Sequence, residues 1–297
     1  MPRYSLTVRD FALYGLVVFA WGFSWISLHY QVGVVAPEIS VMWRFVIAAP
    51  LMFALAAMRG ERLGFPPRDH LWFAAMGAAM FSVNFTLFYY GGQYLPSGLL
   101  AVIFSLASVF NVFLGFAVLR QPIDPRVIAG GAIGFLGVAG MFYPQIASAE
   151  FTPNVLLGLA LCVGGTLCFC SGNMVSALLQ RRGIAVFPAC AYGMIYGAAG
   201  LCIFAMLRGS AFIIDPTAKY IGGLIFLAVV SSVMAFGAYL TLLGRIGADR
   251  AGYSTVMFPV VALTVSTAVE GYQWTWPAIL GLLAVMAGNL LVLRRSK

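Results

Sequence analysis

Long runs of apolar residues recur ten times along the 297-residue chain, and they constrain its fold more than any other feature. Each run is about 20 residues long, the length that an α-helix needs to cross a hydrocarbon core about 30 Å thick. Only 9% of the residues are charged, whereas soluble domains carry about 25%. The sequence therefore predicts an all-α integral membrane protein. Its ten transmembrane helices are expected at approximately 11–29, 38–58, 70–91, 96–119, 125–143, 155–178, 187–207, 219–243, 250–270 and 276–293.

The connections between these runs are short, about nine residues each if ten helices of about 20 residues cross the membrane. They leave no room for a soluble catalytic or nucleotide-binding domain, so we predict a single transmembrane domain over residues 1–297. All five cysteines fall inside apolar runs, which argues against a disulfide framework or a metal site. We expect no metal and no cofactor, and we interpret Phe11–Leu28 as a retained first span, not a cleaved signal peptide.

The basic residues are distributed unequally between the two sides of the predicted bundle. If the N-terminus is inside, 14 of the 17 Lys and Arg residues lie on the inner side. The other three are Arg44, which lies within a span, and Arg208 and Lys219, which lie on the outer side. The positive-inside rule then places both termini in the cytoplasm and the protein in the inner membrane. The same asymmetry explains the net charge of +8 without a nucleic-acid partner.

The two halves of the chain resemble each other at an offset of 151 residues. This offset aligns Pro37 with Pro188, Phe85 with Phe236 and Gly137 with Gly288. It also places the second to fifth predicted spans of residues 1–146 on the corresponding spans of residues 152–297. A shorter offset of 143 residues aligns Gly15 with Gly158 and Gly22 with Gly165 in the first span of each half. Because each half has five spans, an odd number, the second half must enter the membrane from the opposite side. Inverted repeats of this kind are typical of transporters, whose substrate sites lie near the bilayer midplane.

Several short motifs carry a resemblance to a known family, and it extends over essentially the whole chain. They are Ala20-Trp21-Gly22, Trp43-Arg44-Phe45, Phe258-Pro259-Val260 before Glu270, and the pair Gly281 and Gly288 in the last span. On these motifs the sequence resembles the EamA-type transporters, the ten-helix branch of the drug/metabolite transporter superfamily. Within that branch it is most similar to the YddG type of bacterial exporter. The resemblance implies outward transport of aromatic amino acids.

The first half departs from the family pattern at two positions. Ser108 stands where the second half has Pro259, and Gln121 lies near a position where the family often has glutamate. If these positions support gating, the two halves are not equivalent in function.

Polar and aromatic side chains near the predicted midplane are the candidate substrate-binding residues. Polar groups at this depth are costly in lipid and usually face the bundle interior. The candidates are Trp21, Ser24, Phe81, Asn84, Phe88, Ser105, Ser108, Asn111, Thr166, Ser231 and Ser232. An aromatic wall with a few hydrogen-bonding groups is the usual lining of a small-molecule site. The alternative for the hydroxyl side chains is that they bond to their own helix or allow close helix packing.

Arg44, Pro50, Pro259 and Glu270 are candidate structural or gating residues. Arg44 is the basic residue that lies within a span. It either anchors a substrate carboxylate, or reaches the outer surface, or pairs with Glu270 or Glu38, and the family resemblance favours a structural role. The two prolines interrupt helix hydrogen bonding and are either hinges or static kinks.

The fifth span has a face of small residues, Gly130, Gly134 and Gly137. Such a face serves either packing within the bundle or a dimer contact, and we expect packing. An oligomer is therefore possible but not implied.

These features predict a secondary transporter that exports small metabolites, most of all aromatic and other hydrophobic amino acids, by alternating access. Its partners are a small-molecule substrate and the lipid bilayer. An exporter of drugs or nucleobase-like metabolites is the nearest alternative, followed by a channel or lipid scramblase. An intramembrane enzyme is not expected, because the spans lack His-Glu-x-x-His and Gly-x-Ser-x-Gly motifs.

The acidic residues all lie near predicted span ends, and so do both histidines. A proton-driven carrier needs an ionisable group that both faces can reach. We therefore expect movement down the substrate's own gradient, or exchange, without obligatory proton coupling. Glu270 is the residue that would overturn this expectation if a tilt of its helix brought it into the path.

Overall fold

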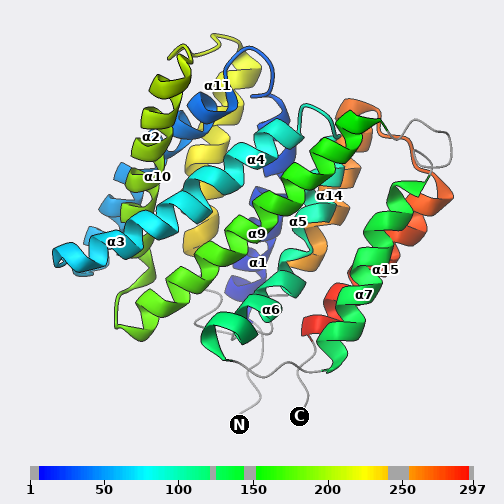
Figure 1. Cartoon of the computed structure of the whole chain (residues 1–297), viewed down its shortest axis with the longest axis horizontal. Helices are drawn as coiled ribbons and strands as arrows, with labels where there is room; N and C mark the ends of the chain where they lie inside the picture. Colours follow the sequence, from blue (N-terminus) through cyan, green and yellow to red (C-terminus); the bar gives the residue numbers. More distant parts are fainter. Residues whose placement is uncertain (1–6, 121–124, 144–151, 240–253, 294–297) are drawn as a thin grey trace.

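The computed structural model describes residues 7–120, 125–143, 152–239 and 254–293, as helices joined by short connections. Seven helices in this part are long and apolar enough to cross a membrane. Three further apolar helices are shorter, Ile128–Met141, Met257–Glu270 and Trp276–Leu291. Together they coincide with the ten predicted spans, which confirms the prediction of an all-α membrane protein with ten transmembrane helices (Figure 1).

The first half supplies spans one to five. They are α1 (Val8–His29), α2 (Pro37–Met58), the composite span α3 (Pro67–Met76), η1 (Gly77–Val83) and α4 (Asn84–Gly91), the broken span α5 (Ser97–Phe104) and α6 (Ala107–Leu119), and α7 (Pro125–Met141). Local signals explain several starting points. Thr7 caps α1 in a reciprocal capping box with Asp10, and α2 and α7 begin at prolines, which fit the first turn of a helix.

The second half supplies spans six to ten. They are α9 (Pro153–Arg181), α10 (Val186–Arg208), the composite span α11 (Ala218–Ile225) and η2 (Phe226–Met234), α14 (Ser254–Glu270) and α15 (Trp276–Leu293). Helix α14 runs through Pro259 without a break, and α2 likewise runs through Pro50. The fourth span, which is the counterpart of α14 in the first half, is the interrupted one: α5 ends and α6 begins around Ser105 and Leu106.

Segments η1 and η2 are π-helical, with hydrogen bonds between residues i and i+5, and they were not predicted from the sequence. Each lies in the middle of the third span of its half. Hydropathy reports how apolar a helix is and not how tightly it is wound, so the span was predicted and its π-helical part was not. The shared position shows that the halves resemble each other in winding as well as in sequence.

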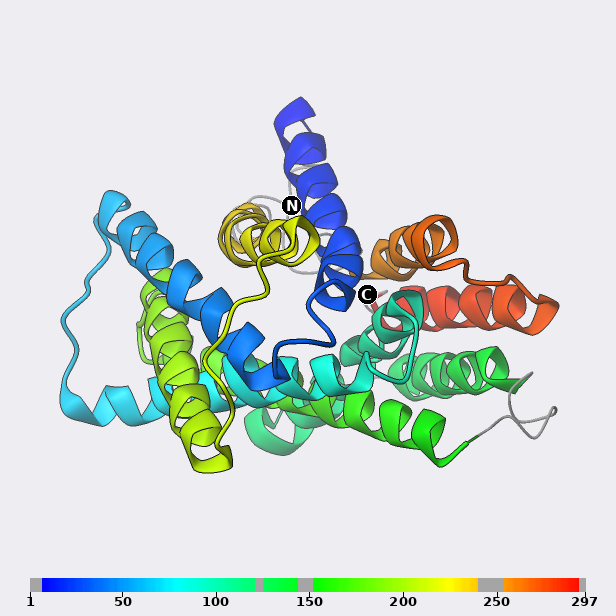
Figure 2. The same cartoon turned by 90° about the horizontal axis from the view of Figure 1, so that it is seen from above.

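The packing of the helices follows a two-fold pattern. Equivalent spans of the two halves pack on each other: α2 on α10, α5 on α14, and α7 on α15. Other contacts occur in matching pairs, since α1 packs on α14 while its counterpart α9 packs on α6. Figures 1 and 2 show α7 and α15 side by side at one edge of the bundle, and α2 beside α10 at the opposite edge. The halves are therefore inverted five-helix repeats, while residue 146, the predicted end of the first, lies outside the described residues.

Helices α7 and α15 touch along their glycines. A Cβ atom added to Gly137 would lie 2.7 Å from the carbonyl oxygen of Gly281, and one added to Gly288 would collide with Gly130. The small-residue face of the fifth span thus packs within the bundle, as expected, and brings the two backbones into contact.

The connections after α1, α4, α10 and α14 lie at one end of the bundle, named here the His29 end. The start of α1 and the end of α15 lie together at the other end, named the Arg59 end after the residue that follows α2 (Figure 1).

Candidate functional site

A cavity of about 70 Å³ lies in the centre of the bundle, between α1, α2, α4, α5, α9, α14 and the second π-helical span. Five of the predicted binding residues line it, together with Arg44. The five are Trp21, Ser24, Asn84, Phe88 and Ser231. Residues from both halves therefore meet around one space, as midplane positions in an inverted repeat are expected to do.

The cavity walls are largely aromatic. Trp25 packs against Phe88 and Phe104 with ring centroids 5.2 and 5.4 Å apart. Trp21 packs edge-on against Phe258 at 5.3 Å. These tilted and edge contacts are the geometries that aromatic rings prefer, and they leave ring faces and edges available to a further ring.

Several of these wall residues were not among the predicted binding residues. They are Trp25, Leu28, Phe85, Phe104, Phe169, Phe236 and Phe258. The structure places Trp25 in the wall beside the predicted Trp21. A usable signal existed for one pair, because Phe85 and Phe236 align at the repeat offset and both line the cavity.

Two of the polar groups in the wall are already satisfied by the protein. Trp21 donates its ring N–H to the backbone oxygen of Ser231 at 3.1 Å, which joins α1 to the second half. Ser24 donates its hydroxyl to the backbone oxygen of Trp21 at 2.7 Å. Ser24 therefore follows the alternative considered for hydroxyl side chains, bonding within its own helix.

Arg44 is buried in the cavity wall with 3% of its surface exposed. Its Nε donates to Ser232 Oγ at 2.9 Å, and its guanidinium carbon lies 4.2 Å from the centroid of the Phe85 ring. The side chain does not reach the surface, and no carboxylate in the described part of the chain lies within ion-pair distance of it. The pairings considered with Glu38 and Glu270 are therefore absent, and a positive charge faces the cavity.

Asn84 is the other strongly polar residue of the wall. It is 1% exposed and stands at the junction of η1 and α4. Its amide nitrogen donates to the backbone oxygen of Met80 at 3.1 Å. Its side-chain oxygen is buried and accepts no hydrogen bond from the part of the chain that the structure describes.

Four predicted hydroxyl residues do not line the cavity, because each is bonded elsewhere. Ser105 and Thr166 donate to backbone oxygens of their own helices, at 2.6 and 2.8 Å. Ser108 donates to Asn289 Oδ1 at 2.5 Å, and Ser232 accepts the bond from Arg44. These residues lie near the middle of their spans, as predicted, but their side chains form hydrogen bonds with neighbouring protein groups and do not line the cavity.

Two further candidates also lie outside the cavity wall. Phe81 is fully buried against Phe45 and Phe236, with centroids 5.3 and 6.3 Å away. Asn111 accepts a hydrogen bond from Asn173 at 3.2 Å and so links α6 to α9. Both residues hold helices together next to the site.

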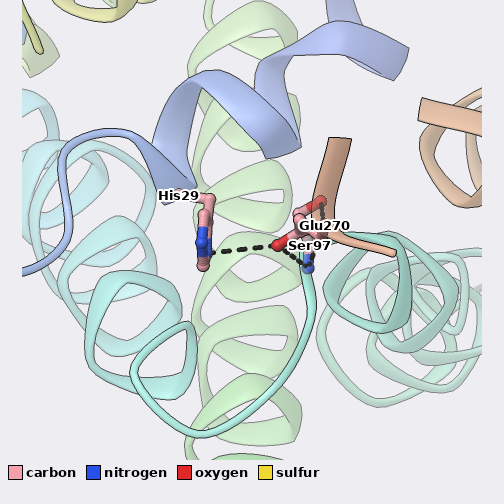
Figure 3. A network of polar contacts seen from close by, with 3 residues as sticks. All are labelled: His29, Ser97 and Glu270. Carbon is pink, nitrogen blue, oxygen red and sulfur yellow. Dashed lines mark hydrogen bonds and ion pairs between the residues drawn. The ribbon is translucent and has the colours of Figure 1, made fainter. Parts of the chain in front are cut away.

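Glu270 lies at the His29 end and does not line the cavity. Figure 3 shows its contacts with His29 and Ser97. Its carboxylate accepts the hydroxyl of Ser97 at 2.5 Å and the backbone N–H of Ser97 at 3.2 Å, and it lies 3.3 Å from Nδ1 of His29. Ser97 is the first residue of α5, so the carboxylate meets the positive end of that helix dipole. The cluster joins the ends of α1 and α14 to the start of α5. Gln121, the other position in the gating argument, lies outside the described residues.

Comparison with known proteins gives consistent results over the whole chain. A sequence model of the EamA-like transporter family matches residues 12–143 and 156–294. "Protein PagO" of Salmonella typhimurium is 24% identical over 99% of this chain and 94% of its own length. A "Probable amino-acid metabolite efflux pump" of Escherichia coli K12 is 22% identical over 94% of this chain and 93% of its own length. One solved crystal structure matches with a TM-score of 0.68 at 12% identity over 95% of each chain, a likeness in fold alone.

Proposed function

Because the chain belongs to the EamA-like transporter family, we propose that it exports aromatic and other hydrophobic amino acids by alternating access. One observation carries the substrate class: a buried guanidinium, which has no carboxylate partner in the described part of the chain, faces a cavity with aromatic walls. The printed name of the Escherichia coli relative, an amino-acid metabolite efflux pump, agrees with this class and with the outward direction.

The chemistry of the cavity fits such a substrate at both ends. A buried charge is costly unless it is paired, and a substrate carboxylate supplies the missing partner of Arg44 through charge-assisted hydrogen bonds. The rings of Trp21, Trp25 and Phe88 offer apolar contact to an aromatic or branched side chain. Binding of the substrate thus offsets the desolvation cost of the unpaired Arg44 guanidinium in the empty protein with an ion pair.

The size of the cavity supports a conformational cycle. About 70 Å³ is room for a few water molecules, whereas sites for small organic ligands measure about 300–1,000 Å³. The described conformation is therefore closed around the site, and binding requires the wall helices to separate. Alternating access includes such a closed state between the two open ones.

The orientation belongs to the same proposal. The unequal distribution of basic residues favours an orientation in the inner membrane with both termini in the cytoplasm. The His29 end then faces the periplasm and the Arg59 end faces the cytoplasm. Among the described residues no carboxylate lines the cavity, which favours movement down the substrate gradient, or exchange, over obligatory proton coupling.

The test is uptake of labelled amino acids into proteoliposomes containing the purified protein. Wild-type protein is expected to move phenylalanine, tyrosine or tryptophan, and Arg44→Ala to lose most of this flux while remaining folded. Arg44→Lys keeps the charge and should retain part of it. Arg208→Ala is the matched control, because Arg208 is half-exposed at the His29 end. Transport of neutral nucleobases by wild type and Arg44→Ala alike would favour the nucleobase or drug exporter instead.

A further inference from the structure

The side-chain oxygen of Asn84, in the wall of the central cavity, is a buried acceptor that has no hydrogen-bond partner among the described residues. We propose that this oxygen binds the α-ammonium group of the substrate, so that the site selects zwitterionic α-amino acids over acids or amines with the same ring. The inference rests on the proposed function, since it takes the carboxylate of the same substrate to lie at Arg44.

The orientation of the Asn84 amide follows from its neighbour. The Met80 backbone oxygen, 3.1 Å away, can only accept a hydrogen bond, so the atom facing it must be the amide nitrogen. The amide oxygen is therefore the free atom, and it can accept hydrogen bonds but not donate them. Its natural partner is a donor such as an ammonium group.

A fully buried side-chain polar atom without a hydrogen-bond partner distinguishes Asn84 from the other described residues of the cavity wall. Among the described residues, the other buried side-chain polar atoms without a partner belong to residues outside the cavity wall, such as Thr86 and Ser266. The backbone oxygens of Trp21 and Ser231, which belong to wall residues, already accept hydrogen bonds from Ser24 and Trp21. Among the described wall residues, Asn84 thus carries the fully buried side-chain acceptor that has no hydrogen-bond partner.

Both polar groups are held on rigid helices. An added Cβ on Gly165 would lie 3.0 Å from the backbone oxygen of Asn84, so α9 presses directly on the start of α4. Arg44 is fixed on α2 by its bond to Ser232. Groups fixed in this way favour a substrate whose charges match their separation.

Charge determines the order of preference. A zwitterion adds no net charge beside Arg44 and satisfies both wall groups. An aromatic acid without the amine pairs with Arg44 but leaves the Asn84 oxygen unpaired, which lowers its affinity. An aromatic amine without the carboxylate places a second positive charge beside a buried guanidinium and is repelled. The expected order is amino acid, then acid, then amine.

The test is competition against flux of labelled L-phenylalanine in proteoliposomes, with 3-phenylpropionate and phenethylamine as the competing compounds. In wild type, unlabelled phenylalanine should compete at least tenfold better than 3-phenylpropionate, and phenethylamine should compete least. Asn84→Leu, similar in size but without an acceptor, should weaken phenylalanine about tenfold and leave 3-phenylpropionate unchanged. Asn84→Asp, which restores an acceptor and adds a negative charge, should improve phenethylamine.

The outcomes separate this inference from the proposed function. If wild type moves no phenylalanine, the proposed function fails and the inference falls with it. If wild type moves phenylalanine but 3-phenylpropionate competes equally well, only the role of Asn84 is wrong. An equal loss for both compounds in Asn84→Leu would likewise make the residue structural. Asn173→Leu, an asparagine outside the cavity wall, is the control for packing, and should leave the order of the three compounds unchanged.

Discussion

Two carboxylates near the His29 end tie together different sets of helices, and their surroundings differ. Glu38 is 1% exposed, accepts the hydroxyls of Tyr90 and Ser210 at 2.8 and 2.6 Å, and lies 3.7 Å from Arg208. It thereby links α2 to α4 and α10. Glu270, with a side chain 11% exposed, joins α1, α5 and α14 through Ser97 and His29.

The difference lies in the partners. Glu38 accepts from the hydroxyls of two residues and lies near a guanidinium, so three side chains hold it. Glu270 accepts from the hydroxyl and the backbone N–H of one residue, Ser97, and lies near an imidazole. We interpret the first cluster as a fixed clamp and the second as the weaker connection, which separates more readily.

The largest effect is expected from Glu38→Ala. The substitution leaves two hydroxyls and a guanidinium without their shared acceptor, which should lower the free energy of unfolding by about 3 kcal/mol. Thermal unfolding in detergent measures this change. Glu61→Ala is the control, because Glu61 contacts the half-exposed Arg59 at the other end of the bundle. An unchanged unfolding temperature would show that the clamp is not structural.

A smaller effect on stability, but a larger one on opening, is expected from Glu270→Gln. The amide can still accept from Ser97, but it loses the charge that attracts His29 and the helix dipole, a cost of about 1 kcal/mol. Labelling of a cysteine introduced at Leu28 in the cavity wall reports the opening. Its rate should rise about fivefold. The same rate in both proteins would remove Glu270 from the gating residues.

The same labelling in His29→Asn is the third comparison. His29→Asn removes the ring nitrogen that lies 3.3 Å from the Glu270 carboxylate, so labelling at Leu28 should be faster than in the wild type. Ser97 still donates to the carboxylate in this variant, so the increase should be smaller than in Glu270→Gln. Equal labelling rates in His29→Asn and wild type would contradict the prediction.

The smallest effect is expected from Arg208→Ala. The Arg208 side chain is 49% exposed and its Nη1 lies 3.7 Å from Glu38, so the ion pair should contribute at most about 1 kcal/mol. Comparing the unfolding temperatures of Arg208→Ala and Glu38→Ala separates the contribution of the ion pair from that of the two hydroxyl hydrogen bonds. A loss as large as that of Glu38→Ala would mean that Arg208, and not the two hydroxyls, holds the clamp.

The sequence predicted the depth of residues in the membrane better than the direction of their side chains. Asn84, Phe88 and Ser231 were found because polar and aromatic residues at the midplane of a bundle usually face inward. Ser105 and Thr166 lie at a similar depth but bond to their own helices, and no periodicity in an apolar helix distinguishes the two outcomes. The rotation of each helix is set by contacts such as Gly165 against α4, which hydropathy does not record.

The π-helical segments also have a meaning for the history of the chain. A π-helical segment contains one residue more than the α-helix that would join the same flanking turns, so η1 and η2 each have the form of a single-residue insertion. Deleting one residue from Phe226–Met234 would restore regular winding and leave the helix on either side in register. Because both halves carry the extra residue at the same place, the simplest history is one insertion that preceded the duplication of an ancestral half-length gene.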